Sequence, residues 1–464
     1  MSLILSAVQL RICEEKSSVP VERLIERAAA AVVGEITKNF AKASVLVLCG
    51  PGNNGKEGSV TAELLKKRGW PVRVLGYGAL GLCPLECDRF AIEESIVIDA
   101  IFGLGLSRPL RADLQGVVEK INASRRFVIS IDTPTGINSD TGEVMGSAIM
   151  ADMTVTFSCL KFAHVVSPGR QYCGVVHIKD IGLDIENSRS FSNAPALWSG
   201  HLPCLTHKSH KYNRGYAVVY SFGMRSAGAV KLAALAALRT GPGAVAVVCS
   251  NEELIVYAAS LTSVMYKLHE EVVSDSRVTA VLIGPGGGPS FASLKDTVLQ
   301  VLGGDDRRGY VLDAGAITAF QSCPAALFAC IRGRRVIMTP HEGEFRQIFP
   351  YLSGSIVERA ISAARESGAV VVLKGHDTVI AAPDGRLAVN NNAPASLATI
   401  GSGDVLAGMI TGLLAAGMDE FHAACCAVWM HGECGKKYKL GLIADDIISS
   451  IPEVYSNIGT YSAL

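Results

Sequence analysis

A glycine-rich stretch early in the sequence has the residue types and spacing of a phosphate-binding turn. CGPGNNGKEG, residues 49–58, follows the apolar run SVLVL and precedes the helix-like segment SVTAELLKKRGW. Gly50, Gly52 and Gly55 fit G-x-G-x-x-G, in which backbone N–H groups and a helix N-terminus face the phosphates of a dinucleotide. The pattern predicts a dinucleotide site or, more simply, a tight turn between a strand and a helix.

A nicotinamide-dependent oxidoreductase would need a second feature. An acidic residue about 20 residues further on, at the end of the next strand, normally binds the ribose hydroxyls. That strand reads PVRVLGYGAL here and ends without Asp or Glu, which argues against hydride transfer. The adjacent amides of Asn53 and Asn54 instead offer uncharged donors and acceptors, which suit a ligand amide or a weakly held cation.

Two further strand ends carry polar side chains. SIVIDAIFG ends in Asp99, before a second glycine-containing loop at 103–109, and FVISIDTPTG ends in Asp132, with Thr135 behind it. Ligands of open parallel sheets bind at the carboxyl ends of the strands, so these side chains are predicted to line one crevice with Asn53 and Asn54. The alternative for a single strand-terminal Asp is a helix cap or a loop brace.

The second reactive stretch is ATIGSGDVLAGMITGLL. Gly401, Ser402 and Gly403 precede an apolar helix, so their free N–H groups can bind an anion. Asp404 could accept the proton of a hydroxyl as phosphate is transferred to it. The alternative is that Asp404 is only an N-terminal helix cap.

Three loops upstream could complete that site. VVVLKGHDTVIAAPDG predicts a strand, a turn with Lys374 and Gly375, and a second strand; Lys374 either neutralises nucleotide phosphates or is a solvated turn lysine. VIMTPHEGEF places His341 and Glu344 after a strand, but no third ligand stands at a spacing typical of zinc. VLIGPGGGPS supplies a glycine loop at 284–288.

The elements that position these residues predict an α/β protein. Because 464 residues exceed one ordinary core, two domains are expected. Apolar runs alternate with amphipathic segments, which indicates parallel sheets covered by helices. The pattern divides the chain into a domain at 1–184, a polar linker at 185–206 and a second domain at 207–464, which ends in helical stretches around Gly401 and His422.

Composition excludes several classes of function. Lys+Arg and Asp+Glu are equal at 43 each, so no bulk charge attracts nucleic acid or an anionic membrane. The N-terminus lacks a signal peptide, and the longest apolar segment is too short to span a bilayer, so a cytoplasmic protein is expected. The 13 cysteines are scattered, and Cys83 and Cys87 have no second pair, which predicts reduced thiols.

The first half resembles the NAD(P)HX epimerase family through GPGNNGKEGSV, DAIFGLGLSRPL, IDTPTGINSDTGEV and KFAHVVSPGRQYCGVVHIKDIGL. The resemblance covers 1–184 and implies a Rossmann-like fold, with Asp132 as acid/base and potassium bound by Asn54, Asp99 and Thr135. It implies that the hydrated nucleotide contacts Asn53, Asn54, Gly55, Lys56, Glu57, Gly103, Leu104, Gly105, Leu106, Ser107, Arg108, Pro109 and Asp132. The family usually reads N-N-G-G-D-G, so Lys56 replaces a glycine and Glu57 is one methylene longer than Asp.

The second half resembles the ribokinase-like superfamily and, within it, the NAD(P)HX dehydratase family, through IGPGGG, TPHEGEF, LKGHDTVIA and GSGDVLAG. The resemblance covers about 205–455 and implies an ADP or ATP donor with magnesium. It implies that the substrate contacts Ala229, Gly288, His341 and the catalytic Asp404. The nucleotide would contact Lys374, Gly375, His376, Asp377, Thr378 and Gly403. The family's acidic D-A-D-A reads DAGA here, with Asp313 followed by Gly315.

Together the resemblances imply a nicotinamide nucleotide repair enzyme. It would interconvert the epimers of NADHX and NADPHX, dehydrate the S epimer to NAD(P)H, and form a homo-oligomer. The main alternative is a ribokinase-like small-metabolite kinase with a degenerate nucleotide-binding N-terminal domain. A non-catalytic nucleotide-binding protein is another alternative, and a hydride-transferring dehydrogenase is the weakest.

Overall fold

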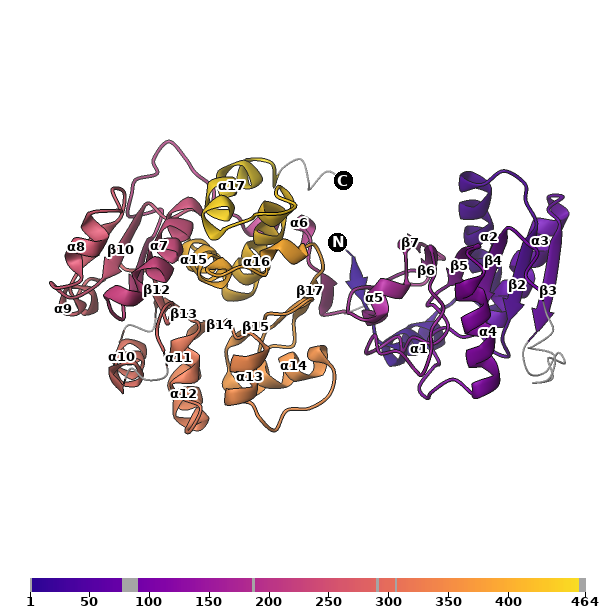
Figure 1. Ribbon diagram of the computed structural model, residues 1–464, viewed down its shortest axis with the longest axis horizontal. Coiled ribbons are helices and arrows are strands. Elements are labelled where there is room, and N and C mark those ends of the chain that lie inside the picture. Colours follow the sequence, from indigo (N-terminus) through magenta and orange to yellow (C-terminus); the bar gives the residue numbers. More distant parts are fainter. Residues whose placement is uncertain (1, 77–90, 186–187, 289–291, 305–306, 459–464) are drawn as a thin grey trace. The chain divides into compact units, whose positions relative to one another are not determined.

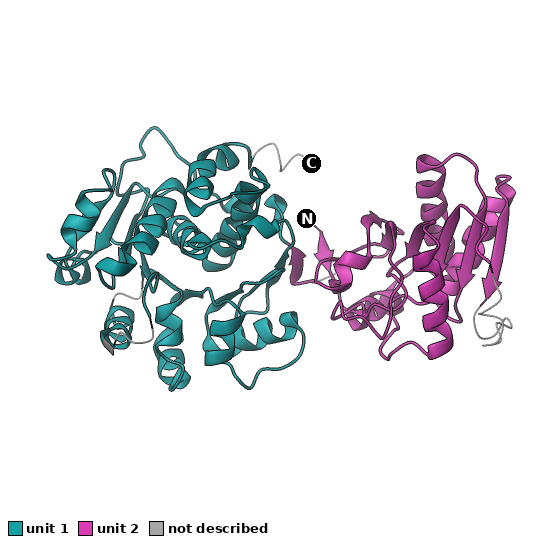
Figure 2. Cartoon of the chain, in the orientation of Figure 1, with its two compact units in different colours: residues 1, 193–464 teal, residues 2–192 magenta. Residues whose placement is uncertain are grey.

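The chain forms two compact units, coloured separately in Figure 2: residues 2–192 and residues 193–464. The break falls inside the segment 185–206. The computed structural model describes residues 2–76, 91–185, 188–288, 292–304 and 307–458.

The first unit is built on a six-stranded, fully parallel sheet of order β3-β2-β4-β5-β6-β7. Parallel neighbours require crossover connections, several of which are helices here. The strands are β2 Val45–Cys49, β3 Val72–Gly76, β4 Ile96–Ala100, β5 Phe127–Ile131, β6 Met153–Phe157 and β7 Val175–Lys179. The helices are α1 Ala7–Lys16, α2 Val21–Asn39, α3 Asn53–Lys67, α4 Ala112–Ala123 and α5 Gly169–Tyr172. A short antiparallel pair, β1 Leu3–Ile4 and β8 Ser190–Ser192, joins the two ends of the unit.

Alternate residues of the central strand β2 enter two separate apolar cores. Val45 and Val47 pack in the core that α2 and α3 cover, whereas Leu46 and Leu48 pack in the core beneath α4. Successive side chains of a strand point to opposite faces, so a strand buried on both faces reads as a continuous apolar run. Helices therefore cover both faces of this sheet, as the sequence predicted (Figure 1).

The second unit has a larger sheet of order β17-β16-β15-β14-β13-β12-β9-β10-β11. Pairing is parallel from β11 to β15 and antiparallel among β15, β16 and β17. The antiparallel pair β15–β16 confirms the predicted strand–turn–strand around Lys374. The strands are β9 Tyr216–Tyr220, β10 Ala244–Val248, β11 Met265–Lys267, β12 Ala280–Ile283, β13 Gly309–Leu312, β14 Arg335–Met338, β15 Val370–Leu373, β16 Thr378–Ala381 and β17 Leu387–Asn390.

Helices lie on both sides of this second sheet. In Figure 1, α7, α15, α16 and α17 lie on one side and α10 to α14 on the other. The helices are α6 Pro195–Trp198, α7 Ala227–Arg239, α8 Leu254–Ala258, α9 His269–Val273, α10 Ala292–Leu302, α11 Gly315–Thr318, α12 Pro324–Ile331, α13 Glu342–Ile348, α14 Ile356–Ser367, α15 Ser402–Ala415, α16 Glu420–Lys436 and α17 Ala444–Ser456.

The close contact between α15 and α7 depends on glycine. A Cβ at Gly408 would lie 2.2 Å from the backbone oxygen of Ala233, and a Cβ at Gly412 would lie 2.1 Å from Oγ1 of Thr240. Only residues without side chains allow the two backbones to approach this closely. The A-G-M-I-T-G spacing therefore fixes where the N-terminus of α15 lies relative to that of α7.

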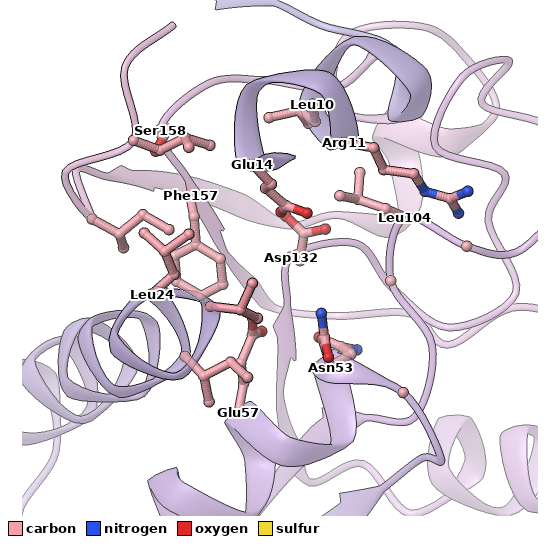
Figure 3. Close-up of a pocket in the computed structure, with 18 of the residues that line it drawn as sticks. Leu10, Arg11, Glu14, Leu24, Asn53, Glu57, Leu104, Asp132, Phe157 and Ser158 are labelled. Carbon is pink, nitrogen blue, oxygen red and sulfur yellow. The ribbon is translucent and has the colours of Figure 1, made fainter. Parts of the chain in front are cut away.

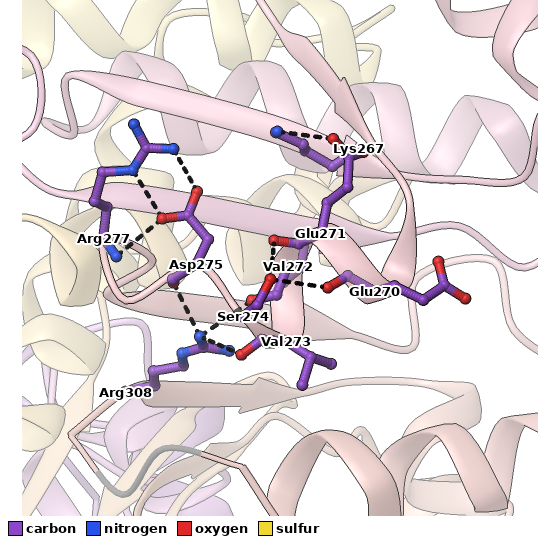
Figure 4. A network of polar contacts seen from close by, with 9 residues as sticks. All are labelled: Lys267, Glu270, Glu271, Val272, Val273, Ser274, Asp275, Arg277 and Arg308. Atoms are coloured by element: carbon purple, nitrogen blue, oxygen red, sulfur yellow. Dashed lines mark hydrogen bonds and ion pairs between the residues drawn. The ribbon is translucent and has the colours of Figure 1, made fainter.

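Arg308 organises the loop that follows α9 (Figure 4). Its buried guanidinium donates to the carbonyl oxygens of Val272 (3.1 Å), Val273 (3.3 Å) and Asp275 (3.0 Å). The last carbonyls of a helix have no partner within the helix, so the arginine satisfies them. Arg277 and Asp275 form an ion pair in the same loop.

The structure differs from the sequence prediction at the C-terminus. The chain was predicted to end in two helical stretches, but a third helix, α17, follows α15 and α16. Ile447, Ile451 and Val454 form its buried stripe, and Pro452, a residue that normally ends a helix, lies inside it. That proline obscured the helical period.

Two sequence expectations concern membranes and cysteines. Among the described residues, no helix is long and apolar enough to cross a bilayer. The described cysteines are all free thiols. Cys83 and Cys87 lie outside the described residues.

Candidate active sites

The first unit contains a cavity of about 270 Å³ at the carboxyl ends of its strands. Three neighbouring strands, β2, β4 and β5, end there, as the sequence predicted. Figure 3 shows Glu14, Asp132 and Asn53 directed into the cavity from three different elements. Apolar side chains of α2 and β6, Leu24 and Phe157 among them, form another part of its wall.

Glycines shape the loop beside this cavity. A Cβ at Gly50 would lie 1.7 Å from the backbone oxygen of Ile101, and a Cβ at Gly55 would lie 1.8 Å from that of Gly50. The tight-turn explanation is therefore correct for these two positions. It does not account for Asn53 and Asn54, which line the cavity.

Asp132 is constrained by both its backbone and its side chain. Its backbone is in the left-handed region, with φ of 66°, which is strained for a residue other than glycine. Its Oδ1 accepts hydrogen bonds from Lys161 Nζ (2.5 Å) and Thr156 Oγ1 (3.0 Å). Both partners are buried. These two hydrogen bonds hold the carboxyl group in a single orientation.

His164 fixes the backbone of Asp132. The backbone N–H of Lys161 donates to Nδ1 of His164 (3.0 Å), so the proton of the neutral imidazole must be on Nε2. Nε2 then donates to the carbonyl oxygen of Asp132 (2.8 Å). Burial lowers the pKa of His164 to about 4, which keeps the ring neutral.

Two further carboxyl groups line the cavity, Glu57 and Glu14, and each has a raised pKa. Burial, with repulsion from Asp132, raises the pKa of Glu57 to about 8. Burial and Asp132 also raise the pKa of Glu14, which comes from α1. The carboxyl group of Glu57 is therefore largely neutral near pH 7.

The predicted potassium ligands lie at the same strand ends. Asp99 is fully buried and accepts from Thr135 N (2.8 Å), Thr135 Oγ1 (2.6 Å) and Ser130 Oγ (2.9 Å). Burial raises its pKa. The side-chain oxygen and nitrogen of Asn54 are buried without any hydrogen-bond partner. Such an orphaned amide is costly unless a ligand satisfies it, and amide and carboxylate oxygens are suitable ligands for an alkali cation.

The predicted contacts of the first unit divide into two groups. A Cβ added at Gly103 would lie 3.3 Å from the side chain of Asp132 and 3.4 Å from that of Asn54, so Gly103 packs against both side chains. Those that line the cavity are Asn53, Asn54, Glu57, Gly103, Leu104, Gly105 and Asp132. Those that lie outside its lining are Gly55, Lys56, Leu106, Ser107, Arg108 and Pro109, of which Leu106 is buried in the core beneath α4.

Sequence reasoning assigned no role to Lys161, His164 or Glu14. Lys161 and His164 are the first and last residues of KFAH, which begins one of the motifs quoted above. A lysine three residues before a histidine does not by itself indicate a function. Glu14 reaches the cavity only because α1 packs there, which no local pattern reveals.

The second unit carries its acidic site at the N-terminus of α15. Asp404 is the third residue of that helix; the cap residue is Gly401, with φ of 83° and no side-chain cap. The alternative that Asp404 is only a helix cap is therefore wrong. Burial, together with repulsion from Asp313, raises the pKa of Asp404 to about 7. A carboxyl group with this pKa is suited to accept a proton near neutral pH.

Lys374 is paired rather than solvated. Its Nζ donates to Asp313 Oδ1 (2.9 Å), which also accepts from Thr339 Oγ1 (2.7 Å). Burial by itself would lower the pKa of Lys374, but the nearby carboxylates outweigh that effect and raise it. A Cβ on Gly403 would lie 3.5 Å from Nζ, so the ammonium borders the free N–H groups of the loop before Asp404.

His341 caps a helix with one ring nitrogen, and its other ring nitrogen lies near the carboxylate of Glu344. Nδ1 accepts from the backbone N–H of Gly343 (2.9 Å) and Glu344 (3.2 Å), and the carboxylate of Glu344 bonds back to the N–H of His341 (2.8 Å). This reciprocal pair begins α13. The structural explanation thus holds for Nδ1, and Nε2 lies 3.4 Å from Glu344 Oε1 on a side chain that is 60% exposed.

Gly315, which stands where the family has an acidic residue, contacts the 284–288 loop. A Cβ at Gly315 would lie 2.1 Å from the backbone oxygen of Gly287. Any side chain at this position would force the loop to move. The loop therefore occupies the space of the absent carboxylate.

The remaining predicted residues of the second unit differ in exposure. Ala229 and Gly288 are half-buried, Gly375 and His376 are exposed, and Asp377 and Thr378 are buried, Thr378 as the first residue of β16. The structure brings Lys374, Gly403 and Asp404 together; the side chains of Asp377 and Thr378 are within the fold.

Fold and sites together define a two-domain α/β protein with an acidic cavity in one unit and, in the other, a buried aspartate at a glycine-rich helix N-terminus beside a paired lysine. The sequence profile of NAD(P)H-hydrate dehydratase matches residues 223–452. That of the YjeF-related protein N-terminus matches residues 21–89 and 82–163.

Similar proteins agree with these profiles. The bifunctional NAD(P)H-hydrate repair enzyme Nnr of Thermofilum pendens is 31% identical over 470 residues, covering 91% of this chain and 88% of that protein. The chain belongs to the family of bifunctional NAD(P)H-hydrate repair enzymes. The ADP/ATP-dependent NAD(P)H-hydrate dehydratase of Bacillus subtilis, co-crystallized with ATP/Mg2+, is 29% identical, with a TM-score of 0.50 over 58% of this chain and 98% of that one. A ribokinase-like superfamily protein of Enterococcus faecalis, 22% identical, has a TM-score of 0.52 over 61% of this chain and 99% of that one and supports the fold alone.

Proposed function

We propose that the chain repairs hydrated nicotinamide nucleotides with two activities. The second unit dehydrates S-NAD(P)HX to NAD(P)H at the expense of ADP or ATP, and the first unit interconverts the R and S epimers. The observation that carries the proposal is Asp404, whose pKa is raised to about 7, beside Lys374 at a glycine-rich helix N-terminus.

The dehydration requires phosphoryl transfer followed by elimination. The oxygen of the ring hydroxyl attacks the terminal phosphorus of the nucleotide, and Asp404 accepts the proton of that hydroxyl. The bond between this phosphorus and the nucleotide leaving group breaks. Loss of phosphate and of a ring proton then restores the double bond. Phosphate leaves far more readily than hydroxide, which explains the need for a nucleotide.

The nucleotide phosphates would lie against the N–H groups of Gly401 to Gly403. Lys374 would offset their charge, and its pairing with Asp313 holds its ammonium in place. Magnesium bound with the nucleotide would neutralise phosphate charge, in keeping with the ATP/Mg2+ complex of the Bacillus relative. ADP is our expected donor, with ATP as the alternative.

The test is a repair assay. Full-length protein with NADHX and either nucleotide should restore NADH absorbance and release free phosphate. A ribokinase-like small-metabolite kinase, the alternative, would accumulate a stable phosphorylated product instead. No recovery of NADH with either donor would refute the dehydratase assignment.

In the first unit, we assign proton transfer to Asp132. Lys161 and Thr156 hold its carboxylate in one orientation, and the neutral Glu57 can donate a proton from another part of the cavity wall. Glu57 differs from the family's Asp by one methylene, yet its carboxyl group still lines the cavity. Epimer interconversion measured by chromatography, without nucleotide, tests this half separately.

The first unit offers side-chain oxygens that are suitable ligands for potassium. Asn54, whose amide has no partner, would bind it with Asp99 and Thr135, and the ion would place positive charge beside the nucleotide. The epimerisation rate should rise when potassium replaces a bulky organic cation, and Asn54→Ala should abolish that dependence. The expected homo-oligomer stays a prediction.

A further inference from the structure

A cluster of metal-ligating side chains lies in the second unit, formed by residues other than those assigned to the dehydratase site. It consists of His201, Asp419 and His422, with one ligand atom of each lying within 4.8 Å of the others. Nδ1 of His422 is 2.5 Å from Asp419 Oδ2, and Nδ1 of His201 is 3.8 Å from the same oxygen. Two imidazoles thus present the same ring nitrogen to one carboxylate oxygen.

The two carboxylate oxygens of Asp419 have separate partners. Oδ1 accepts from the backbone N–H of His422 (3.3 Å) as the cap of α16 and faces Arg386 (3.7 Å). Oδ2 faces only the imidazoles among the contacts of the described residues. An ion could therefore bind Oδ2 without removing the helix cap or the ion pair with Arg386.

The ligand set and spacing select a class of ion. Two imidazoles and one carboxylate suit Zn²⁺ and its neighbours, whereas Mg²⁺ prefers oxygen ligands alone. Zinc takes nitrogen and oxygen ligands at about 2.0–2.2 Å, so ligand atoms around one ion lie about 3.3 Å apart. Reaching that spacing requires side-chain rotations. The imidazole rings stack at 3.7 Å, and rotation at His201 is easy because its side chain is 51% exposed.

The cluster also joins two segments that already contact each other. Asn193 donates to the carbonyl oxygen of Cys425 (2.8 Å), and Trp198 packs on Trp429 with ring centroids 5.6 Å apart. Both contacts attach the entry segment of the unit to α16. A metal ion at His201 would add a third attachment, near the N-terminus of that helix.

We propose that His201, Asp419 and His422 bind a transition-metal dication of the Zn²⁺ type, which fixes residues 193–201 to α16. Three protein ligands leave a fourth position for water. The site is separate from magnesium bound with the nucleotide.

The test is a calorimetric titration of chelator-treated, full-length protein with Zn²⁺. The wild type should bind an ion that His201→Ala weakens by about tenfold or more, since even changes to groups behind the ligands cost that much. Asp419→Asn should weaken binding as well while keeping the helix cap, because Asn caps as well as Asp does. His207→Ala, an exposed histidine outside the cluster, is the control and should bind as the wild type does.

Two readouts separate this site from the free thiols. Co²⁺ bound by nitrogen and oxygen should show visible bands without the sulfur charge-transfer band. Zn²⁺ should raise the melting temperature of the wild type and of His207→Ala more than that of His201→Ala or Asp419→Asn. Equal zinc affinity in the wild type, His201→Ala and Asp419→Asn would overturn the proposal. So would a Co²⁺ spectrum that is dominated by sulfur and unchanged in His201→Ala.

Discussion

Replacing Asp404 by Asn should greatly slow dehydration and at the same time stabilise the second unit. Burial raises the pKa of Asp404 in the folded protein from 3.8 to about 7. Between these values the folded protein holds a proton that the unfolded chain has released. The free energy of unfolding of the wild type therefore falls as pH rises through this window, and the neutral Asn removes that dependence.

The size of the effect follows from the two pKa values. Each pKa unit is worth about 1.36 kcal/mol, so ionising Asp404 costs the folded wild type about 4 kcal/mol above pH 7. About 2–3 kcal/mol of this cost develops between pH 5 and pH 8. Asn does not reproduce every contact of the carboxyl group, so we expect Asp404→Asn to exceed the wild type by about 1–4 kcal/mol at pH 8. Its turnover should fall by about 10²–10⁴, the usual contribution of a general base.

Unfolding of the second unit can be followed by fluorescence. The chain has 3 tryptophans, and in a Trp70→Phe background the remaining two, Trp198 and Trp429, both lie in the second unit. Urea unfolding at pH 5 and pH 8 would compare Asp404→Asn with the unsubstituted background. Asp445→Asn, an exposed acid in the first turn of α17, is the matched control and should change stability little at either pH.

Two results would refute the reasoning. One is a variant less stable than the wild type at pH 8, which would mean that the carboxylate is stabilised by its surroundings. The other is a stability difference that is the same at pH 5 and pH 8. Retained turnover would remove Asp404 from the mechanism whatever its stability.

Three further substitutions test other parts of the two sites. Lys161→Met leaves Asp132 buried without its lysine partner. The free energy of unfolding of the first unit should fall by about 3–5 kcal/mol, and its epimerase activity should be lost. Unchanged thermal unfolding would contradict this. The pKa of Glu57 is raised to about 8, so the epimerisation rate should decline as pH rises through 8. The Glu57→Gln enzyme should not show this decline. A pH profile identical to that of the wild type would exclude Glu57 as a proton donor. Gly315→Asp forces the loop at Gly287 to move. It should lower the free energy of unfolding by about 1–3 kcal/mol and raise the KM for NADHX. Wild-type kinetics would show that the loop adapts freely.

Parts of each site were predictable because they follow single strands or helix starts. Asp99 lies at the end of a strand, Asp132 directly follows one and Asp404 follows a glycine turn, so their placement at a ligand-binding edge needs only the parallel topology. The same local reasoning left open whether Lys374 is solvated. Its pairing with Asp313, 61 residues earlier, is a consequence of strand order that no local pattern contains.

The sequence by itself determined the α/β class, the two glycine-rich turns and which strand ends carry acids, because these depend on apolar period and on residues that lie close together along the chain. The tertiary structure decided which of the carboxyl groups have shifted pKa values. Lys161 reaches Asp132 from 29 residues away, and burial together with repulsion from Asp132 raises the pKa of Glu57 to about 8. Burial and distances between side chains set these pKa values, and both exist only when separate segments pack together.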